Sequence, residues 1–171
     1  VGAPGDDSDL KVLTNADGIG ELVTLFEDES PFLTIDSGAV HIFEKNNDSW
    51  AQQAYMKASN ADAGDRFGSA VSLSGTTLYV GAPREDGSAS GFNKNLGSNN
   101  LSNSGAVYQF FLFSEFGNWT FSNYIKGAPA MAGALFGRSI DSDYGVILVG
   151  APKEITVPGE AQGRLYVLEE T

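Results

Sequence analysis

Apolar residues in this chain gather in short runs that are interrupted by glycine-rich turns. β-Branched and aromatic residues dominate these runs, which span residues 67–73, 77–82, 105–113 and 119–126 in the clearest set. Runs of this length, bounded by turn residues, are typical of β-strands. Ser74-Gly75 and Asp143-Tyr144-Gly145 supply tight turns between neighbouring runs, because glycine tolerates a positive φ. No stretch of useful length shows the 3.6-residue period of a helix, so the pattern predicts an all-β protein.

The runs belong to a repeat. Val-Gly-Ala-Pro occurs at residues 1–4, 80–83 and 149–152, and Phe-Gly lies 13 residues before the second and third copies. Segments 50–83 and 119–152 align without gaps and are identical at 12 of 34 positions. We expect packing to explain the repeated residues, since aromatic side chains can fill the space between sheets and glycine allows backbones to approach. They include Trp50, Phe67, Gly68, Gly81, Ala82 and Pro83, and Trp119, Phe136, Gly137, Gly150, Ala151 and Pro152.

A third shared block begins at Gly38, Gly105 and Gly163, so a complete unit has four strands. Four antiparallel strands repeated in series are the signature of a β-propeller blade. The sequence therefore predicts about ten strands in about two and a half blades. We expect strands 2–4 of a partial blade in residues 1–58, a complete blade in 59–126, and strands 1–3 of a partial blade in 127–171. Residue 1 would then fall inside a blade, and the segment is expected to come from a longer or processed chain.

The motifs also carry a family resemblance. Phe67-Gly68 followed by Val80-Gly81-Ala82-Pro83, with a second copy at Phe136 and Val149, resembles the FG-GAP repeat of integrin α-subunit-like β-propellers. The run from Asn60 to Gly68 and the strand that starts with tryptophan resemble bacterial and protist members. The resemblance implies an extracellular or cell-surface protein that binds other molecules, although one fold can host many functions.

Several blades of that family carry a calcium loop of the type Asp-x-Asp-x-Asp-Gly before the Gly-Ala-Pro strand. Here residues 72–77 contain no carboxylate, and residues 141–145 keep only Asp141 and Asp143. Calcium requires six to eight oxygen ligands, and neither loop supplies them alone. The acidic run with Asp6, Asp7 and Asp9 could also ligate a cation. Calcium is thus the one cofactor that these five residues make possible.

Charge and composition exclude some classes. The 22 acidic residues against 10 basic ones give a net charge of -12, which argues against binding a nucleic-acid backbone. There is no cysteine, so neither disulfides nor thiolate metal sites can form. No apolar run approaches the roughly 18 residues of a membrane span.

The repeats of this chain differ most in the connections between Gly-Ala-Pro and the third strand. Variable loops on rigid blades often bind partners. The acidic connection 5–37 contains apolar runs at 22–26 and 32–35, which predict an extra hairpin. This hairpin either folds back on its own blade or pairs with another subunit. The connection 84–104 is rich in Gly, Ser and Asn. Asn47, Asn100 and Asn118 begin glycosylation sequons, which favour a secreted chain.

Three functions stay open at this stage. The first is a non-catalytic extracellular scaffold that binds a protein or glycan ligand for adhesion or recognition. The second is a structural subunit that assembles with further copies of itself through unpaired blade edges. The third is the scaffold part of a larger enzyme. His41 is the only histidine and occupies a strand position, so no triad is available, and no carboxylate pair stands out by spacing. The sequence therefore predicts no enzyme activity.

Overall fold

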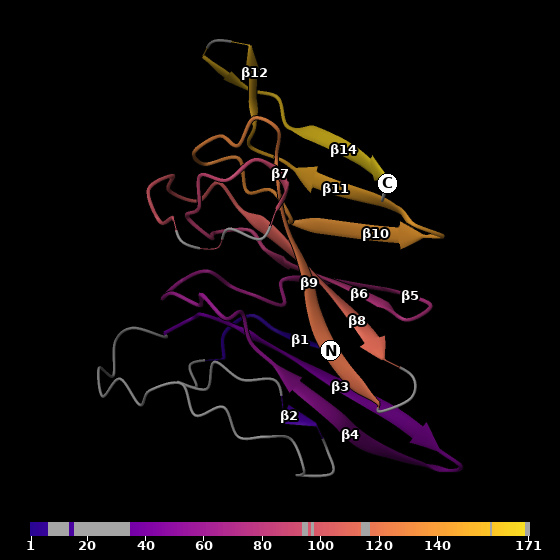
Figure 1. The fold of residues 1–171 in the computed structure, drawn as a ribbon. Helices are drawn as coiled ribbons and strands as arrows, with labels where there is room; N and C mark the ends of the chain where they lie inside the picture. Colours follow the sequence, from indigo (N-terminus) through magenta and orange to yellow (C-terminus); the bar gives the residue numbers. More distant parts are fainter. Residues whose placement is uncertain are drawn as a thin grey trace.

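The computed structural model describes residues 1–6, 14–15, 35–93, 96, 98–113, 117–157 and 159–169. Within these residues every regular element is a β-strand, and all strand pairing inside the sheets is antiparallel. Three main sheets follow one another along the molecule, with the N-terminal sheet at one end and the C-terminal sheet at the other (Figure 1). The predicted all-β fold of partial propeller blades is confirmed.

The middle sheet is the complete blade. Its strands β5 (Ala70–Ser74), β6 (Thr77–Ala82), β8 (Ala106–Phe113) and β9 (Asn118–Lys126) lie side by side in chain order. A fifth strand, β7 (Gly91–Asn93), comes from the connection after Pro83 and pairs with the outer edge of β9. The sheet therefore has five strands where four were predicted.

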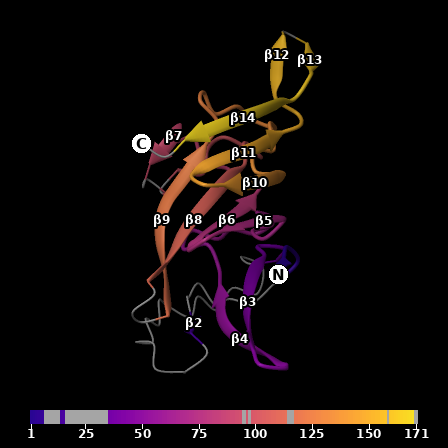
Figure 2. The ribbon, with the colours of Figure 1, turned by 90° about the vertical axis from the view of Figure 1, so that its right-hand side faces the viewer.

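The two flanking sheets are partial blades. The first contains β1 (Gly2–Ala3), β3 (Ala39–Asn46) and β4 (Ser49–Met56), with the short β2 (Thr14–Asn15) on its outer edge. The third contains β10 (Ser139–Asp143), β11 (Val146–Ala151) and β14 (Arg164–Glu169). A separate hairpin of β12 (Ile155–Val157) and β13 (Glu160–Ala161) projects from one end (Figure 2). The exact blade boundaries at residues 58 and 126 stay predictions.

Alternate side chains of each blade face opposite neighbours. Tyr108 and Phe110 of β8 join a buried cluster with Val40 and Met56 of the first blade, whereas Val107 joins a second cluster with residues of the third blade. Period-two alternation of a strand produces these two faces. The middle blade therefore buries apolar side chains on both sides, and the two clusters are the core of the molecule.

The repeated phenylalanines pack between blades as expected. Phe67 and Phe136 are at most 1% exposed. Phe67 meets Tyr108 edge-on with ring centroids 5.3 Å apart, and Phe136 meets Tyr166 in the same way at 5.1 Å. Neither phenylalanine lies in a regular strand, which corrects the predicted start of the strand at residue 67. Each instead forms a parallel bridge, to Gly38 and to Gly105 respectively.

Glycines let the backbones of neighbouring blades touch. A Cβ atom on Gly81 would lie 2.1 Å from the carbonyl oxygen of Gly137. A Cβ atom on Gly2 would clash in the same way with the carbonyl oxygen of Gly68. Gly38 and Gly105 are covered in the same manner by the carbonyls of Phe67 and Phe136. The repeated glycines therefore set the close spacing of the blades.

Candidate functional site

An acidic residue lies two positions after the proline of each Gly-Ala-Pro motif and turns inward. In the middle blade Glu85 is buried, and its Oε2 lies 2.6 Å from Nζ of Lys126, which also donates to Oγ of Ser104 at 2.6 Å. In the first blade Lys57 Nζ donates to Asp6 Oδ1 at 3.2 Å and to Ser37 Oγ at 2.7 Å. Removing one partner of such a buried pair leaves an uncompensated charge, at a cost of about 3–5 kcal/mol. These pairs tie the connection after the second strand to the fourth strand.

The third copy of this arrangement uses different partners. Glu154 is 2% exposed, and its Oε1 lies 3.0 Å from Arg164 Nη1. The hydroxyl of Tyr166 donates to Glu154 Oε2 at 2.7 Å. Both partners come from β14, where the other blades use a lysine of the fourth strand.

Asp65 is a buried carboxyl beside the middle network. Its pKa is raised from the ordinary 3.8 to about 7, mainly by burial and also by the neighbouring carboxylates of Glu85, Asp62 and Asp86. The hydrogen bond that its Oδ2 accepts from the Asp62 amide opposes this rise. Burial also lowers the pKa of Lys126, although Glu85 opposes this shift. Asp65 therefore changes its charge near neutral pH.

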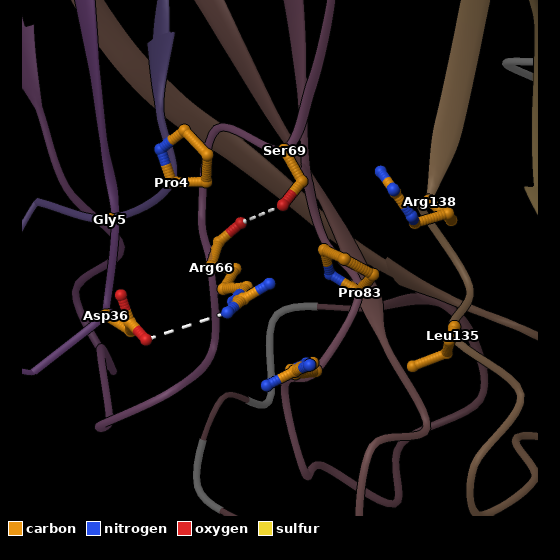
Figure 3. A pocket seen from close by; sticks show the side chains of 9 residues that line it. Pro4, Gly5, Asp36, Arg66, Ser69, Pro83, Leu135 and Arg138 are labelled. Carbon is orange, nitrogen blue, oxygen red and sulfur yellow. Dashed lines mark hydrogen bonds and ion pairs between the residues drawn. The ribbon is translucent and has the colours of Figure 1, made fainter.

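A pocket of about 410 Å³ lies where the three blades meet, at the end of the strands that carries the Phe-Gly and Gly-Ala-Pro motifs. Figure 3 shows labelled side chains from all three blades around this space. Its lining consists of Pro4, Gly5, Asp36, Arg66, Ser69, Pro83, Arg84, Leu135 and Arg138. Of the four arginines in the chain, all except Arg164 line it.

The pocket is locally basic in an acidic chain. Arg66 Nη2 lies 3.7 Å from Asp36 Oδ2, the one carboxylate among the lining residues (Figure 3). Within the described residues, neither Arg84 nor Arg138 forms an ion pair. Each of the three arginines lies within one residue of a Phe-Gly or Gly-Ala-Pro motif, a sequence signal that points to this pocket once the blades are placed.

The outer face of the third blade is apolar and open. Leu165 and Val167 on β14 are 63% and 62% exposed, whereas Val107, which occupies the position equivalent to Leu165 in the middle blade, is fully buried. Beside them lies a hollow of about 500 Å³ lined by residues that include Gly150 and Gly163. The equivalent glycines of the other blades are covered by the Phe-Gly backbone of the next blade.

The three candidate calcium ligands that the structure describes, Asp6, Asp141 and Asp143, do not form a common site. Asp6 is paired with Lys57 and accepts a hydrogen bond from the Tyr55 hydroxyl at 2.9 Å, while Asp7 and Asp9 lie outside the described residues. Asp141 and Asp143 are exposed on β10. The described part of the chain contains no group of three or more His, Cys, Asp or Glu side chains placed to hold a metal ion. Calcium binding at these five positions stays a prediction.

The remaining sequence candidates lie on strands and turns. The sequon residues Asn47, Asn100 and Asn118 are exposed, and their glycosylation stays a prediction. Trp119 is 7% exposed and packs in the cluster between the first and middle blades, whereas Trp50 is 68% exposed because no described blade covers the equivalent face of β4. The packing role expected for Trp50 stays a prediction.

His41 on β3 packs edge-on against Tyr55, with ring centroids 5.0 Å apart. Its Nδ1 atom lies 3.3 Å from Oε1 of Gln52. The apolar runs 22–26 and 32–35 of the predicted extra hairpin, apart from Ile35, fall among residues that the structure does not describe.

Comparison with known protein families matches part of the chain. Residues 50–111, which extend from β4 of the first blade to β8 of the second, match the family model of the FG-GAP repeat. No curated protein matches the chain. In the described residues no helix has the length and hydropathy needed to cross a membrane.

Proposed function

Because the chain contains an FG-GAP repeat, which suggests a β-propeller-like protein-interaction domain, we propose that it is a non-catalytic scaffold for protein recognition or adhesion outside the cell. The observation that carries the proposal is the open apolar face of the third blade. Leu165 and Val167 stand on this face, and the hollow at Gly150 and Gly163 adjoins it.

The repeat itself indicates what this face would bind. Val40 and Val107 occupy the position of Leu165 in the first and second blades, and each is at most 1% exposed against the following blade. A partner that presents a similar blade would bury Leu165 and Val167 and place backbone over the two glycines. The exposed apolar surface near the open hollow is the kind that marks a protein-binding site.

The double substitution of Leu165→Ser and Val167→Ser tests the proposal. We expect it to abolish capture of protein partners in a pull-down from the native extracellular fraction, with the fold retained in circular dichroism. Tyr144→Asn is the matched control, because Tyr144 is 95% exposed on the β10–β11 turn of the same blade but lies off this face. If the double variant captures the same proteins as the unchanged chain, the open face is not the recognition surface.

A second candidate is self-assembly, which the two ends of the molecule favour. His41 and Phe43 of the first blade occupy the positions of Tyr108 and Phe110, which bury themselves against the preceding blade, yet Phe43 is 43% exposed. The outer faces of the first and third blades are thus complementary halves of the interface that recurs inside the chain. A head-to-tail contact of this kind builds rings or filaments.

Light scattering over a concentration series tests self-assembly. We expect the average mass to rise with concentration, and the same double substitution in β14 to prevent the rise. A constant monomer mass at every concentration would reject self-assembly and leave recognition of other proteins intact.

The extracellular part of the proposal is supported by the exposed sequons. Asn47 lies in the β3–β4 turn and Asn118 is the first residue of β9, both at the opposite end of the strands from the arginine-lined pocket, so glycans there would leave that pocket open. Secretion from a eukaryotic cell should yield protein that loses mass on deglycosylation. Secreted protein that carries no glycan at any sequon would contradict this part.

A further inference from the structure

We propose that the pocket lined by Arg66, Arg84 and Arg138 binds an acidic side chain of a protein partner. The occupant rests on the proposed protein-binding function, whereas the pocket and its charge are features of the structure itself. The pocket shares Arg138 with the hollow beside β14, whereas Arg66 and Arg84 line the pocket alone, so Arg84→Ala tests the pocket separately from that hollow.

The three arginines that line the pocket indicate that its ligand carries an oxyanion. Arginine presents a planar fork of N–H donors that matches the two oxygens of a carboxylate. Three of the four arginines of the chain share this pocket, although the chain as a whole has a net charge of -12. Chance placement on an acidic surface would not gather them at the meeting point of three blades.

Geometry supports a carboxylate in particular. The pocket already holds one carboxylate, that of Asp36, which faces Arg66 across 3.7 Å (Figure 3). Arg84 and Arg138 have no ion-pair partner among the described residues, so two guanidinium groups stay available to an incoming ligand. The backbone that carries them is fixed, since the Arg84 amide donates to the Asp65 carbonyl and the Arg138 amide to the Leu135 carbonyl.

The negative charge of the rest of the chain favours a ligand whose own negative charge is confined to the pocket. A polyanion such as a nucleic acid or a sulfated polysaccharide would extend beyond the pocket over a surface with excess negative charge, which repels it. A volume of about 410 Å³ accepts one or two side chains. A short acidic segment of a protein meets both conditions, because its charge can stay inside the pocket.

The test uses the whole 171-residue chain and two blocked tetrapeptides, acetyl-Gly-Asp-Glu-Gly-amide and acetyl-Gly-Asn-Gln-Gly-amide, in calorimetric titration. We expect the acidic peptide to bind and its isosteric amide counterpart not to bind. Arg84→Ala and Arg138→Ala should each weaken the acidic peptide about tenfold or more, since a lost charge-assisted hydrogen bond is worth roughly 1.5–3 kcal/mol. Lys45→Ala, which removes an exposed cation of β3 that lines neither this pocket nor the hollow beside β14, should leave the affinity unchanged.

Both key arginines are exposed, so their removal should leave thermal unfolding unchanged and any loss of binding can be assigned to the pocket. Equal binding of the two peptides, or an equal effect of Lys45→Ala, would overturn the proposal. Inorganic phosphate is tested as a competitor of the bound acidic peptide. If it displaces the bound peptide at a lower concentration than unlabelled acidic peptide does, the pocket is a general oxyanion site and the assignment to an acidic protein segment is overturned. Arg84→Ala should not alter association through β14, so failure at one site does not imply failure at the other.

Discussion

At the scale of single residues, Asp65 makes stability depend on pH. The folded protein holds a proton on this carboxyl up to about pH 7, while the unfolded chain releases it near 3.8. Between these values the folded state binds more protons, so stability falls as pH rises through the window and is lowest above about pH 7. Ionised Asp65 therefore destabilises the fold at neutral and alkaline pH.

Asp65→Asn should remove this effect. The amide keeps an oxygen that can accept the Asp62 N–H, but it carries no charge for burial and the surrounding carboxylates to oppose. We expect the free energy of unfolding at pH 8 to rise by on the order of 2–3 kcal/mol, with little change at pH 4. Denaturant titrations at the two pH values measure this, with Asp48→Asn in the exposed β3–β4 turn as control. An equal effect of both substitutions would show that burial of Asp65 is not the cause.

The sequence predicted the packing of single residues correctly where a repeated motif gives them the same surroundings in each blade. Phe67 and Phe136 pack between blades because both belong to the Phe-Gly motif that bridges to the preceding blade. Trp50 repeats Trp119 in sequence but not in burial, since Trp119 faces the first blade, whereas no described blade covers the equivalent face of β4. The cluster of Arg66, Arg84 and Arg138 could not be predicted, because it depends on how three blades are placed.

At the scale of elements, a glycine sets the distance between the second and third blades. Gly81→Ala would place a Cβ atom against the Gly137 carbonyl, which is backbone and cannot rotate away. Gly150→Ala, the equivalent change in the third blade, meets only the hydroxyl of Ser139, a side chain that can move. We expect urea unfolding to show a loss of about 2–3 kcal/mol for Gly81→Ala and less than about 1 kcal/mol for Gly150→Ala. Similar losses would mean that glycine acts through strand propensity alone.

The sequence predicted the long strands better than the short ones. β6, β8 and β9 lie within one residue of their predicted bounds, because runs of six or more apolar and β-branched residues carry a clear signal. β2 and β7 have two and three residues in polar connections and show no such period. They form because the outer edge of the fourth strand has unpaired backbone N–H and C=O groups, with which a neighbouring connection can pair.

At the scale of the whole molecule, the blades should differ in local stability. The middle blade is packed on both faces, whereas each flanking blade is packed on one. In repeat-like architectures the stability of a unit depends on its interfaces with its neighbours. We therefore expect the amides of β6 and β8 to exchange with deuterium more slowly than those of β3 and β11, which occupy comparable positions in the flanking sheets.

Hydrogen exchange followed by mass spectrometry measures this difference. The comparison is made at low protein concentration, where association through the open faces is weakest. Equal protection in all three sheets would show that the blades open together as one cooperative unit.

The parallel bridges also determine how the chain carries tension. Residues 35–37 and 64–67 run in the same direction and are joined by hydrogen bonds from Gly64 to Ile35, Arg66 to Asp36 and Phe67 to Ser37 at 2.8–3.0 Å, and a similar set joins residues 102–104 to 133–136. A force that pulls the two ends of the chain apart slides such segments past each other, so it loads the bonds in shear. Bonds loaded in shear share the force and rupture together rather than one after another. We therefore expect each junction between blades to resist tension as a mechanical clamp.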